Sequence, residues 1–211
     1  MNVTFLSAKN TYDFIVRDED HFISSLTPQD LCARNTRSRQ AYLTRAAQSA
    51  ADFTPEEKAI LIQNVHLANK YLSRLRSVPG LTPEVICPIP WIFAKCSDEY
   101  EGGLPHTRGS VIFTMNGELQ MKECIHEKIH IYQRLHPGAA RIYLTARGYL
   151  RVARHPMKRA NPDQDNHTYT KHGKLFDGIY NSDNPMNISA VANTRHPYEM
   201  MSYEAIKVLG F

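Results

Sequence analysis

Apolar residues recur with helical spacing before residue 80. Five of them are separated by three or four positions and therefore form one stripe on a helix. Thr54 and Glu57, with Pro55 between them, form a capping box before the stripe, and Pro79-Gly80 follows it as a stop signal. The pattern predicts a helix that begins at Pro55 and ends before Pro79. The apolar residues of the stripe are Leu61, Val65, Ala68, Leu72 and Leu75.

A similar start signal lies earlier in the chain. Thr27 can cap a helix, Pro28 suits its first position, and Asp30 places an acidic residue in the first turn. We expect a helix from about Pro28 to Ala51. The first 80 residues are thus predicted to form a helical pair, in which no pattern of residues indicates chemistry.

The pattern changes from helix to strand beyond residue 80. Residues 84–97, EVICPIPWIFAKCS, are rich in β-branched and aromatic residues, and their prolines favour an edge strand. Residues 109–117, GSVIFTMNG, predict a second short strand that ends in an Asn-Gly turn. The two strands indicate a small, mostly antiparallel sheet.

Helical spacing returns between Leu119 and Leu135, and Pro137-Gly138 ends this helix. The side chains expected on its buried side are Cys124, Ile125, Ile129, Tyr132 and Leu135.

The rest of the chain predicts two more helices with a polar region between them. We expect one helix from about Ala139 to Val152, then loops and a short hairpin in residues 155–185, and a last helix that begins at His196-Pro197. Residues 1–211 are therefore interpreted as a single α+β domain. Residues 1–80 form its helical N-terminal part. Residues 81–211 form the part that contains the candidate metal-binding and catalytic residues.

Composition indicates a soluble globular protein, because 42% of the 211 residues are hydrophobic and 22% are charged. No run approaches the ~18 apolar residues of a membrane span, and the N-terminal residues lack the apolar block of a signal peptide. We therefore expect an intracellular, cytoplasmic protein. Its cysteines contain no CxxC pair and are expected to be reduced; they are Cys32, Cys87, Cys96 and Cys124.

The net charge of +4 is mild, but two stretches of the chain are basic: residues 34–40 and 146–159. Such stretches can bind nucleic acid or an acidic peptide. Neither has the interleaved aromatic residues of a base-stacking surface, so solvated surface segments are the favoured interpretation and nucleic acid is not expected as a partner.

The sequence HEKIH, residues 126–130, places His126 and His130 on one face of the predicted helix, about 6 Å apart along its axis. That arrangement suits two imidazoles on one tetrahedral zinc ion. Glu127 adjoins the first histidine, where it can reach water at the metal and act as a general base. The alternative is an ordinary helix whose histidines face solvent or the core.

A hydrolytic zinc site needs a third protein ligand, and three residues compete for that place. His136 follows His130 by six positions, the separation found in metzincins, but those proteins carry Gly where this chain has Gln133. In a continuous helix, His136 would lie ~15 Å from His126. Glu199, in the first turn of the last helix, is the preferred candidate. Glu204 is the third candidate. It lies about 140° around that helix from Glu199, so the two carboxylates cannot face the same ion.

The chain resembles the zincin metallopeptidases of the gluzincin clan through HEKIH and HPYEMMSYEA. It is also similar, over roughly residues 85–211, to small uncharacterised zincin-like proteins of protists and large DNA viruses. The segments that carry this second resemblance are LPHTRGSVIF, HEKIHIYQR, RANPDQDN and HPYEMMSYE. The chain differs from better-studied gluzincins in having HPYE where an Asn-Glu pair is usual.

The resemblance implies a zinc-dependent peptidase in which His126, His130 and Glu199 bind zinc and Glu127 is the catalytic base. Zincins also stabilise the developing oxyanion with a Tyr, His or Arg near the metal. Tyr203, one turn beyond Glu199, is the first candidate for this role, and His106 in LPHTRG is the second.

The resemblance also bears on partners. Zincins place an edge strand before the active-site helix, so the substrate is expected to be an extended peptide antiparallel to Val111–Met115. The viral likeness would also allow association with a virion. The alternative from another class is a non-catalytic, zincin-like metal-binding module that binds a protein or nucleic-acid partner.

Overall fold

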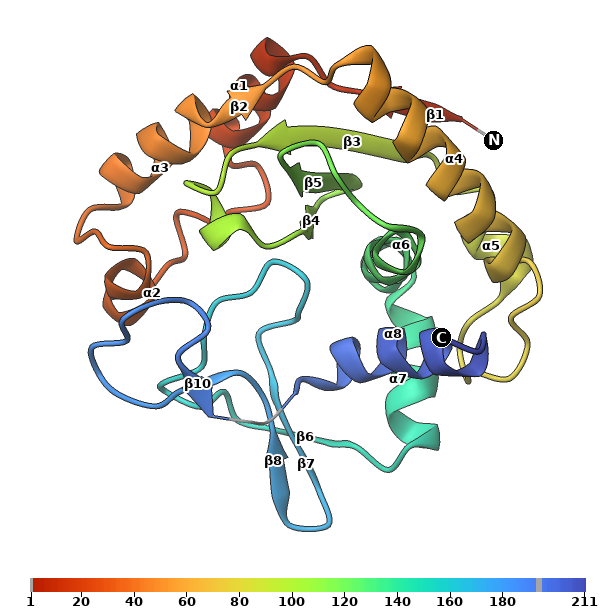
Figure 1. Ribbon diagram of the computed structural model, residues 1–211. Coiled ribbons are helices and arrows are strands. Elements are labelled where there is room, and N and C mark those ends of the chain that lie inside the picture. Colours follow the sequence, from red (N-terminus) through yellow and green to blue (C-terminus); the bar gives the residue numbers. More distant parts are fainter. Residues whose placement is uncertain (1, 193–194) are drawn as a thin grey trace.

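The computed structural model describes residues 2–192 and 195–211, and the chain folds as an α+β protein (Figure 1). Its α-helices are α1 (Ala8–Arg17), α2 (Pro28–Ala33), α3 (Arg39–Gln48), α4 (Pro55–Leu72), α5 (Pro83–Ile86), α6 (Met121–Leu135), α7 (Pro137–Ala146) and α8 (Pro197–Val208). Its strands are β1 (Val3–Phe5), β2 (Ala50–Ala51), β3 (Trp91–Cys96), β4 (His106–Arg108), β5 (Val111–Met115), β6 (Leu150–Val152), β7 (Thr168–Lys171), β8 (Lys174–Phe176), β9 (Ile179–Tyr180) and β10 (Val191–Ala192).

The largest sheet has the strand order β1-β3-β5-β4, and β2 also pairs with β3. Strands β1 and β5 run parallel to β3, whereas β2 is antiparallel to β3 and β4 is antiparallel to β5. This sheet is therefore mixed, and the expected mostly antiparallel arrangement is wrong. The prediction of an edge strand in residues 84–97 is also wrong. Pro88 and Pro90 precede β3, which begins at Trp91, so a central position costs β3 no backbone donor.

Each face of this sheet packs on its own hydrophobic core. On one face Trp91, Phe93 and Ile112 pack with residues of α4 and α6. On the other face Ala94 and Phe113 pack with residues of α1, α2 and α3. Successive side chains of a strand point to opposite faces, so neighbours such as Phe93 and Ala94 enter different cores. Apolar side chains thereby hold helix α6 against one face of the sheet.

The apolar stripe predicted for residues 61–75 is confirmed, because its five side chains are at most 1% exposed. The capping box is confirmed too: the N–H of Glu57 donates to the Thr54 hydroxyl over 3.2 Å, and the N–H of Thr54 donates to the Glu57 carboxylate over 2.8 Å. Helix α4 ends at Leu72, however, earlier than Pro79 suggests.

The helix expected from Pro28 to Ala51 is wrong as a single element, because it divides into α2 and α3, and β2 follows α3. Asn35 adopts a left-handed conformation with φ 53°, which ends the first helix. Ser38 then begins the second, because its hydroxyl accepts from the N–H of Ala41 over 3.2 Å.

The expected elements of the C-terminal half are present with two corrections. Four of the five residues predicted to be buried on α6 are buried, but Leu135 is 48% exposed at the helix end. Helix α7 ends at Ala146, before Gly148 with φ 71°, and residues 150–152 form β6 instead of continuing the helix to Val152. The expected hairpin is β7–β8.

The C-terminal segments approach α6 from the side away from the main sheet. Figure 1 shows α6 nearly end-on at the centre right, with α8 passing beside it and the hairpin β7–β8 farther from the sheet. Met201 and Ala205 of α8 enter the same core as Ile125 and Ile129 of α6. Within the described ranges, no helix is long and apolar enough to cross a membrane.

A buried ion pair joins the N-terminal helices to the loop before β4. Arg34 donates to both carboxylate oxygens of Glu101 over 2.8 and 2.6 Å, and the Tyr42 hydroxyl donates to the same carboxylate over 2.5 Å. Burial raises the pKa of Glu101, but the Arg34 guanidinium outweighs this effect and holds the pKa below its ordinary value. Glu101 is therefore ionised in the folded protein, and it is the nearer of two buried carboxylates beside Arg34; the other is Asp30, 3.9 Å from Nη1.

We predict that Glu101→Gln lowers the free energy of unfolding by ~3–5 kcal/mol at pH 7, because it removes the bidentate counter-ion of the buried Arg34 and leaves only Asp30, 3.9 Å away. A depressed pKa stabilises the fold above the ordinary pKa of 4.5 and loses that contribution as the pH falls further. Urea unfolding measured at pH 7 and at lower pH should therefore show the gap between wild type and variant shrinking below pH 4.5.

The matched control is Glu84→Gln, which breaks the exposed ion pair between Glu84 and Arg76. This substitution should change the free energy of unfolding by less than ~1 kcal/mol. Equal losses in the two variants would contradict a structural role for the buried pair.

Candidate metal centre

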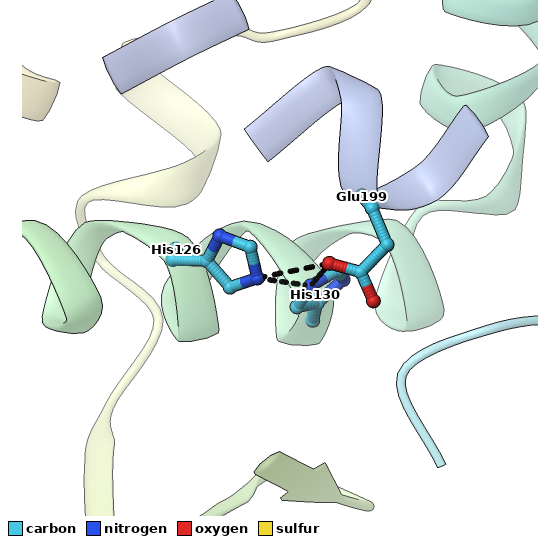
Figure 2. Close-up of side chains that lie close together, drawn as sticks. All are labelled: His126, His130 and Glu199. Carbon is cyan, nitrogen blue, oxygen red and sulfur yellow. Dashed lines mark hydrogen bonds and ion pairs between the residues drawn. The ribbon is translucent and has the colours of Figure 1, made fainter. Parts of the chain in front are cut away.

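Three potential metal ligands from two helices converge at one point. The Nε2 atoms of His126 and His130, both on α6, lie 3.0 Å apart. An Oε2 atom of Glu199, in the first turn of α8, lies 3.1 Å from the first of these nitrogens and 3.5 Å from the second. Figure 2 shows the carboxylate of Glu199 reaching from α8 toward both imidazoles. In the ranges 2–192 and 195–211, this is the group with metal-ligand geometry.

The lysine inside HEKIH fixes the orientation of α6 on the sheet. The Lys128 ammonium is buried and donates to the carbonyl oxygens of Ile89 and Pro90, the latter over 3.1 Å. It also lies 4.1 Å from the centre of the Trp91 ring. Burial lowers the pKa of Lys128 to about 7. Since Lys128 points into the sheet, His126 and His130 face away from it, toward α8.

The start of α8 is fixed by a buried histidine. His196 accepts from the N–H of Tyr198 over 3.3 Å through Nδ1, as the predicted cap of the helix. Its Nε2 lies 3.3 Å from Asp165 and 3.1 Å from the carbonyl oxygen of His167. The first turn of α8, which carries Glu199, is thereby tied to the loop before β7.

Gln133 connects the two helices directly. Its Oε1 lies 2.9 Å from Nδ1 of His130, so the amide can accept the proton of that imidazole and leave Nε2 free for a metal. Its Nε2 donates to the carbonyl oxygen of Tyr198 over 3.0 Å. In the sequence, Gln133 stands out only as the residue at the position where metzincins carry Gly. Its position three residues after His130 on the same helix is a signal that could have revealed this role.

Two amides orient the carboxylate of Glu199. The side chains of Asn161 and Gln164 each donate to Oε1 over 3.3 Å, while Oε2 faces the histidines. These residues lie in a loop far from Glu199 in sequence, and helical spacing could not have indicated them. The arrangement suits a carboxylate that offers one oxygen to a metal.

The electrostatics of the site favour a positive charge between the ligands. Burial lowers the pKa of His130, but the carboxylates of Glu199 and Asp163 outweigh this and raise it to about 10. Burial raises the pKa of Glu199, and the neighbouring imidazoles outweigh that in turn, so the pKa lies well below its ordinary value. The carboxylate therefore stays ionised, and a cation at the imidazoles is stabilised.

Glu127 lies beside the ligands but is not one of them. It is 4% exposed, and its Oε2 atom has no hydrogen-bond partner among the described residues. Burial, together with the charges of Asp163 and Glu199, raises its pKa well above the ordinary value. A buried carboxylate oxygen without a partner is costly, so its retention here points to a ligand or water in the adjoining space.

A cleft of about 290 Å³ opens beside these residues. His126, Glu127 and Glu199 line it, together with the segment 104–106 and the loop 159–164. Buried polar groups therefore converge on a hollow that a small part of a substrate can enter.

The two candidates for oxyanion stabilisation both line this cleft. The Tyr203 ring lies 5.2 Å from the His126 ring and is 41% exposed. His106 is buried, its Nδ1 donates to the carbonyl oxygen of Leu104 over 2.9 Å, and its Nε2 has no described partner. Of the two candidates, Tyr203 is the one whose ring contacts a candidate metal ligand, His126.

The competing third ligands lie elsewhere. Helix α6 continues through Gln133, and His136 follows its last residue with its ring 5.0 Å from that of Tyr132. The carboxylate of Glu204 pairs with Arg147 and accepts from the Tyr143 hydroxyl over 3.1 Å. Neither residue joins the group of three.

The donor set fits zinc. Two imidazole nitrogens and one carboxylate oxygen are the ligands of many catalytic zinc sites, and ligand atoms ~2.1 Å from a tetrahedral ion lie ~3.4 Å apart. The observed separations of 3.0, 3.1 and 3.5 Å need only small adjustments to reach that value.

The expectation that a peptide pairs with Val111–Met115 is contradicted over Val111–Phe113, because this part of β5 pairs with β3 on one side and with β4 on the other. The edge strand is β4, but its backbone at Thr107 already has partners. The N–H of Thr107 donates to Asp163 over 2.8 Å, and its carbonyl oxygen accepts from Arg134 over 3.3 Å. The outward-facing backbone groups of Thr107 are therefore not free to pair with another strand.

Comparison of the chain with protein-family models, with curated proteins and with solved structures finds no match. The geometry of the site is thus the basis for a functional proposal.

We predict that the purified protein binds one zinc ion per chain and that Glu199→Ala weakens this binding by orders of magnitude. His136→Ala is the matched control and should leave zinc affinity unchanged, because His136 lies outside the group of three. Elemental analysis after gel filtration measures the zinc content of each protein. Competition with a chelator measures its zinc affinity. Zinc that stays well below one equivalent after Zn²⁺ is added would exclude the site.

We also predict that Gln133→Leu lowers zinc affinity by roughly 10- to 100-fold, the usual effect of removing the outer partner of a ligand histidine. Gln133→Glu keeps an acceptor for His130 and should retain more of the affinity. Chelator competition on both variants, with circular dichroism to confirm folding, provides the measurement. Equal zinc affinity in the Leu variant and the wild type would argue against this role.

Proposed function

We propose that this protein is a zinc-dependent metallopeptidase. The observation that carries the proposal is the convergence of His126, His130 and Glu199 beside a cleft that is also lined by Glu127. Three protein ligands leave the fourth tetrahedral position open, as a hydrolytic zinc site requires and a closed structural site does not.

A zinc ion held by His126, His130 and Glu199 would supply Lewis-acid chemistry, lowering the pKa of a water molecule and polarising a carbonyl oxygen. The protein supplies the proton transfer. Glu127 accepts a proton from the attacking water and donates it to the leaving amine, so that the amine departs neutral. Its buried position and raised pKa strengthen the carboxylate as a proton acceptor.

Tyr203 is proposed to stabilise the oxyanion. Burial and the nearby Glu199 carboxylate raise the pKa of its hydroxyl, so the hydroxyl keeps its proton and can donate a hydrogen bond. The Arg195 guanidinium lies 4.4 Å from the centre of the Tyr203 ring and holds a positive charge near the same point.

The proposed substrate is a peptide or protein segment in an extended conformation. An extended chain presents one peptide bond to the metal while its side chains reach the walls of the cleft. Since Thr107 closes the edge of β4, selectivity is expected from those side-chain contacts rather than from pairing with a strand.

We predict that Glu127→Gln keeps the fold and the zinc but lowers peptide cleavage by at least ~100-fold, the usual contribution of general acid–base catalysis. The amide preserves the shape of the side chain and cannot accept the proton. Wild type and variant are compared on a peptide library at matched zinc content.

Tyr132→Phe provides the control. Tyr132 lies on the same helix and donates to the carbonyl oxygen of Gly80 over 2.8 Å, away from the metal ligands, so cleavage should be unchanged. Cleavage that survives Glu127→Gln would point to another mechanism. A zinc-loaded wild type that cuts no peptide of a broad library would favour the non-catalytic module.

A further inference from the structure

The cleft beside the metal centre contains an arginine without a counter-ion. Arg159, the last residue of the basic stretch 146–159, lines the cleft and forms no ion pair with a carboxylate of the described residues. Its Nη1 donates to the carbonyl oxygen of Ile188 over 2.9 Å. Its Nε is buried and has no described partner. The Nε–Nη2 edge of the guanidinium is therefore unused.

Gly178 keeps the space next to this edge free of side-chain atoms. The backbone N–H of Arg159 donates to the carbonyl oxygen of Gly178 over 2.8 Å, which places the arginine side chain over the glycine. A Cβ atom at Gly178 would lie 3.5 Å from Nε and 3.7 Å from Nη2. The Nε–Nη2 edge is one of the two edges with which a guanidinium binds a carboxylate through parallel hydrogen bonds.

The acidic residues that line the cleft are Glu101, Glu127, Asp163 and Glu199, and in the described part of the chain none of them forms an ion pair with Arg159. Three of the four have other partners. Glu101 is paired with Arg34. Asp163 accepts from the N–H and the hydroxyl of Thr107 over 2.8 and 2.6 Å. Glu199 faces the two histidines. Arg195, exposed at the same cleft, adds a second positive charge.

We propose that Arg159 binds a carboxylate of the substrate, so that the cleft selects peptides with an acidic group close to the bond that is cut. This inference rests on the proposed peptidase function. The carboxylate belongs either to an Asp or Glu side chain or to the C-terminus of the peptide. Both present the planar pair of oxygens that the free edge of Arg159 can bind.

The test measures binding separately from cleavage. Three pools of octapeptides are offered to zinc-loaded protein in the Glu127→Gln background, which prevents cleavage. The pools are amidated peptides with Glu at one fixed position, amidated peptides with Gln there, and Gln peptides with a free C-terminus. Affinity selection and mass spectrometry measure retention. We expect the Glu pool or the free-terminus pool to be retained at least ~10-fold better than the amidated Gln pool, the scale of a charge-assisted bidentate bond. Which of the two is retained identifies the source of the carboxylate.

Variants assign the selectivity to Arg159. Arg159→Gln should reduce retention of the preferred pool to that of the amidated Gln pool. Gly178→Ala, which keeps the arginine and places a methyl group against its free edge, should reduce the preference as well. Arg154→Gln removes an exposed arginine of the same basic stretch from outside the cleft and should keep the full preference. Zinc content and thermal unfolding are measured for each variant.

The outcomes separate the two proposals. Equal retention of all pools, or no retention of any, overturns the role of Arg159, as does a preference that survives Arg159→Gln. Cleavage of all three pools at equal rates by the wild type would also overturn it while leaving the peptidase proposal intact. Selective retention without any cleavage by the wild type supports the carboxylate site and rejects the peptidase.

Discussion

The placement of the first turn of α8 against α6 is the constraint on which the site depends. Two histidines one turn apart already lie on one face of a helix, whereas the third candidate ligand, Glu199, belongs to a segment far away in sequence. Glu199 reaches them because buried polar contacts hold the start of α8 at two points. Gln133 binds its backbone from α6, and His196 binds the loop before β7. Apolar packing of Met201 completes the attachment.

Neutral amides, rather than further charges, arrange the ligands. Gln133 accepts from His130, while Asn161 and Gln164 donate to the oxygen of Glu199 that points away from the histidines. Amides direct a ligand through hydrogen-bond geometry and add no net charge that would compete with the metal. Of the charged groups that line the cleft, Glu199 belongs to the candidate ligands, Glu101 is paired with Arg34, and Asp163 accepts hydrogen bonds from Thr107.

Local patterns were enough to predict the elements that carry the ligands. The spacing of His126 and His130, and the His196-Pro197 start signal, depend on residues within one helix, and α6 and α8 follow them. The order of the strands could not be predicted, because the pairing of β3 with β1 and β5 depends on contacts between distant segments. Long-range contacts also determine the amides around Glu199 and the buried ion pair of Arg34, which no periodicity reveals.

The closed edge of β4 has a consequence for self-association. An open strand edge is a template on which another chain can add a strand, and aggregation often begins there. Here Asp163 and Arg134 occupy the backbone groups of Thr107 with side chains. The other side of β3 is shared by β1 and β2, strands of three and two residues. Short strands and occupied backbone groups thus leave this sheet little uninterrupted edge on which a second molecule could extend it.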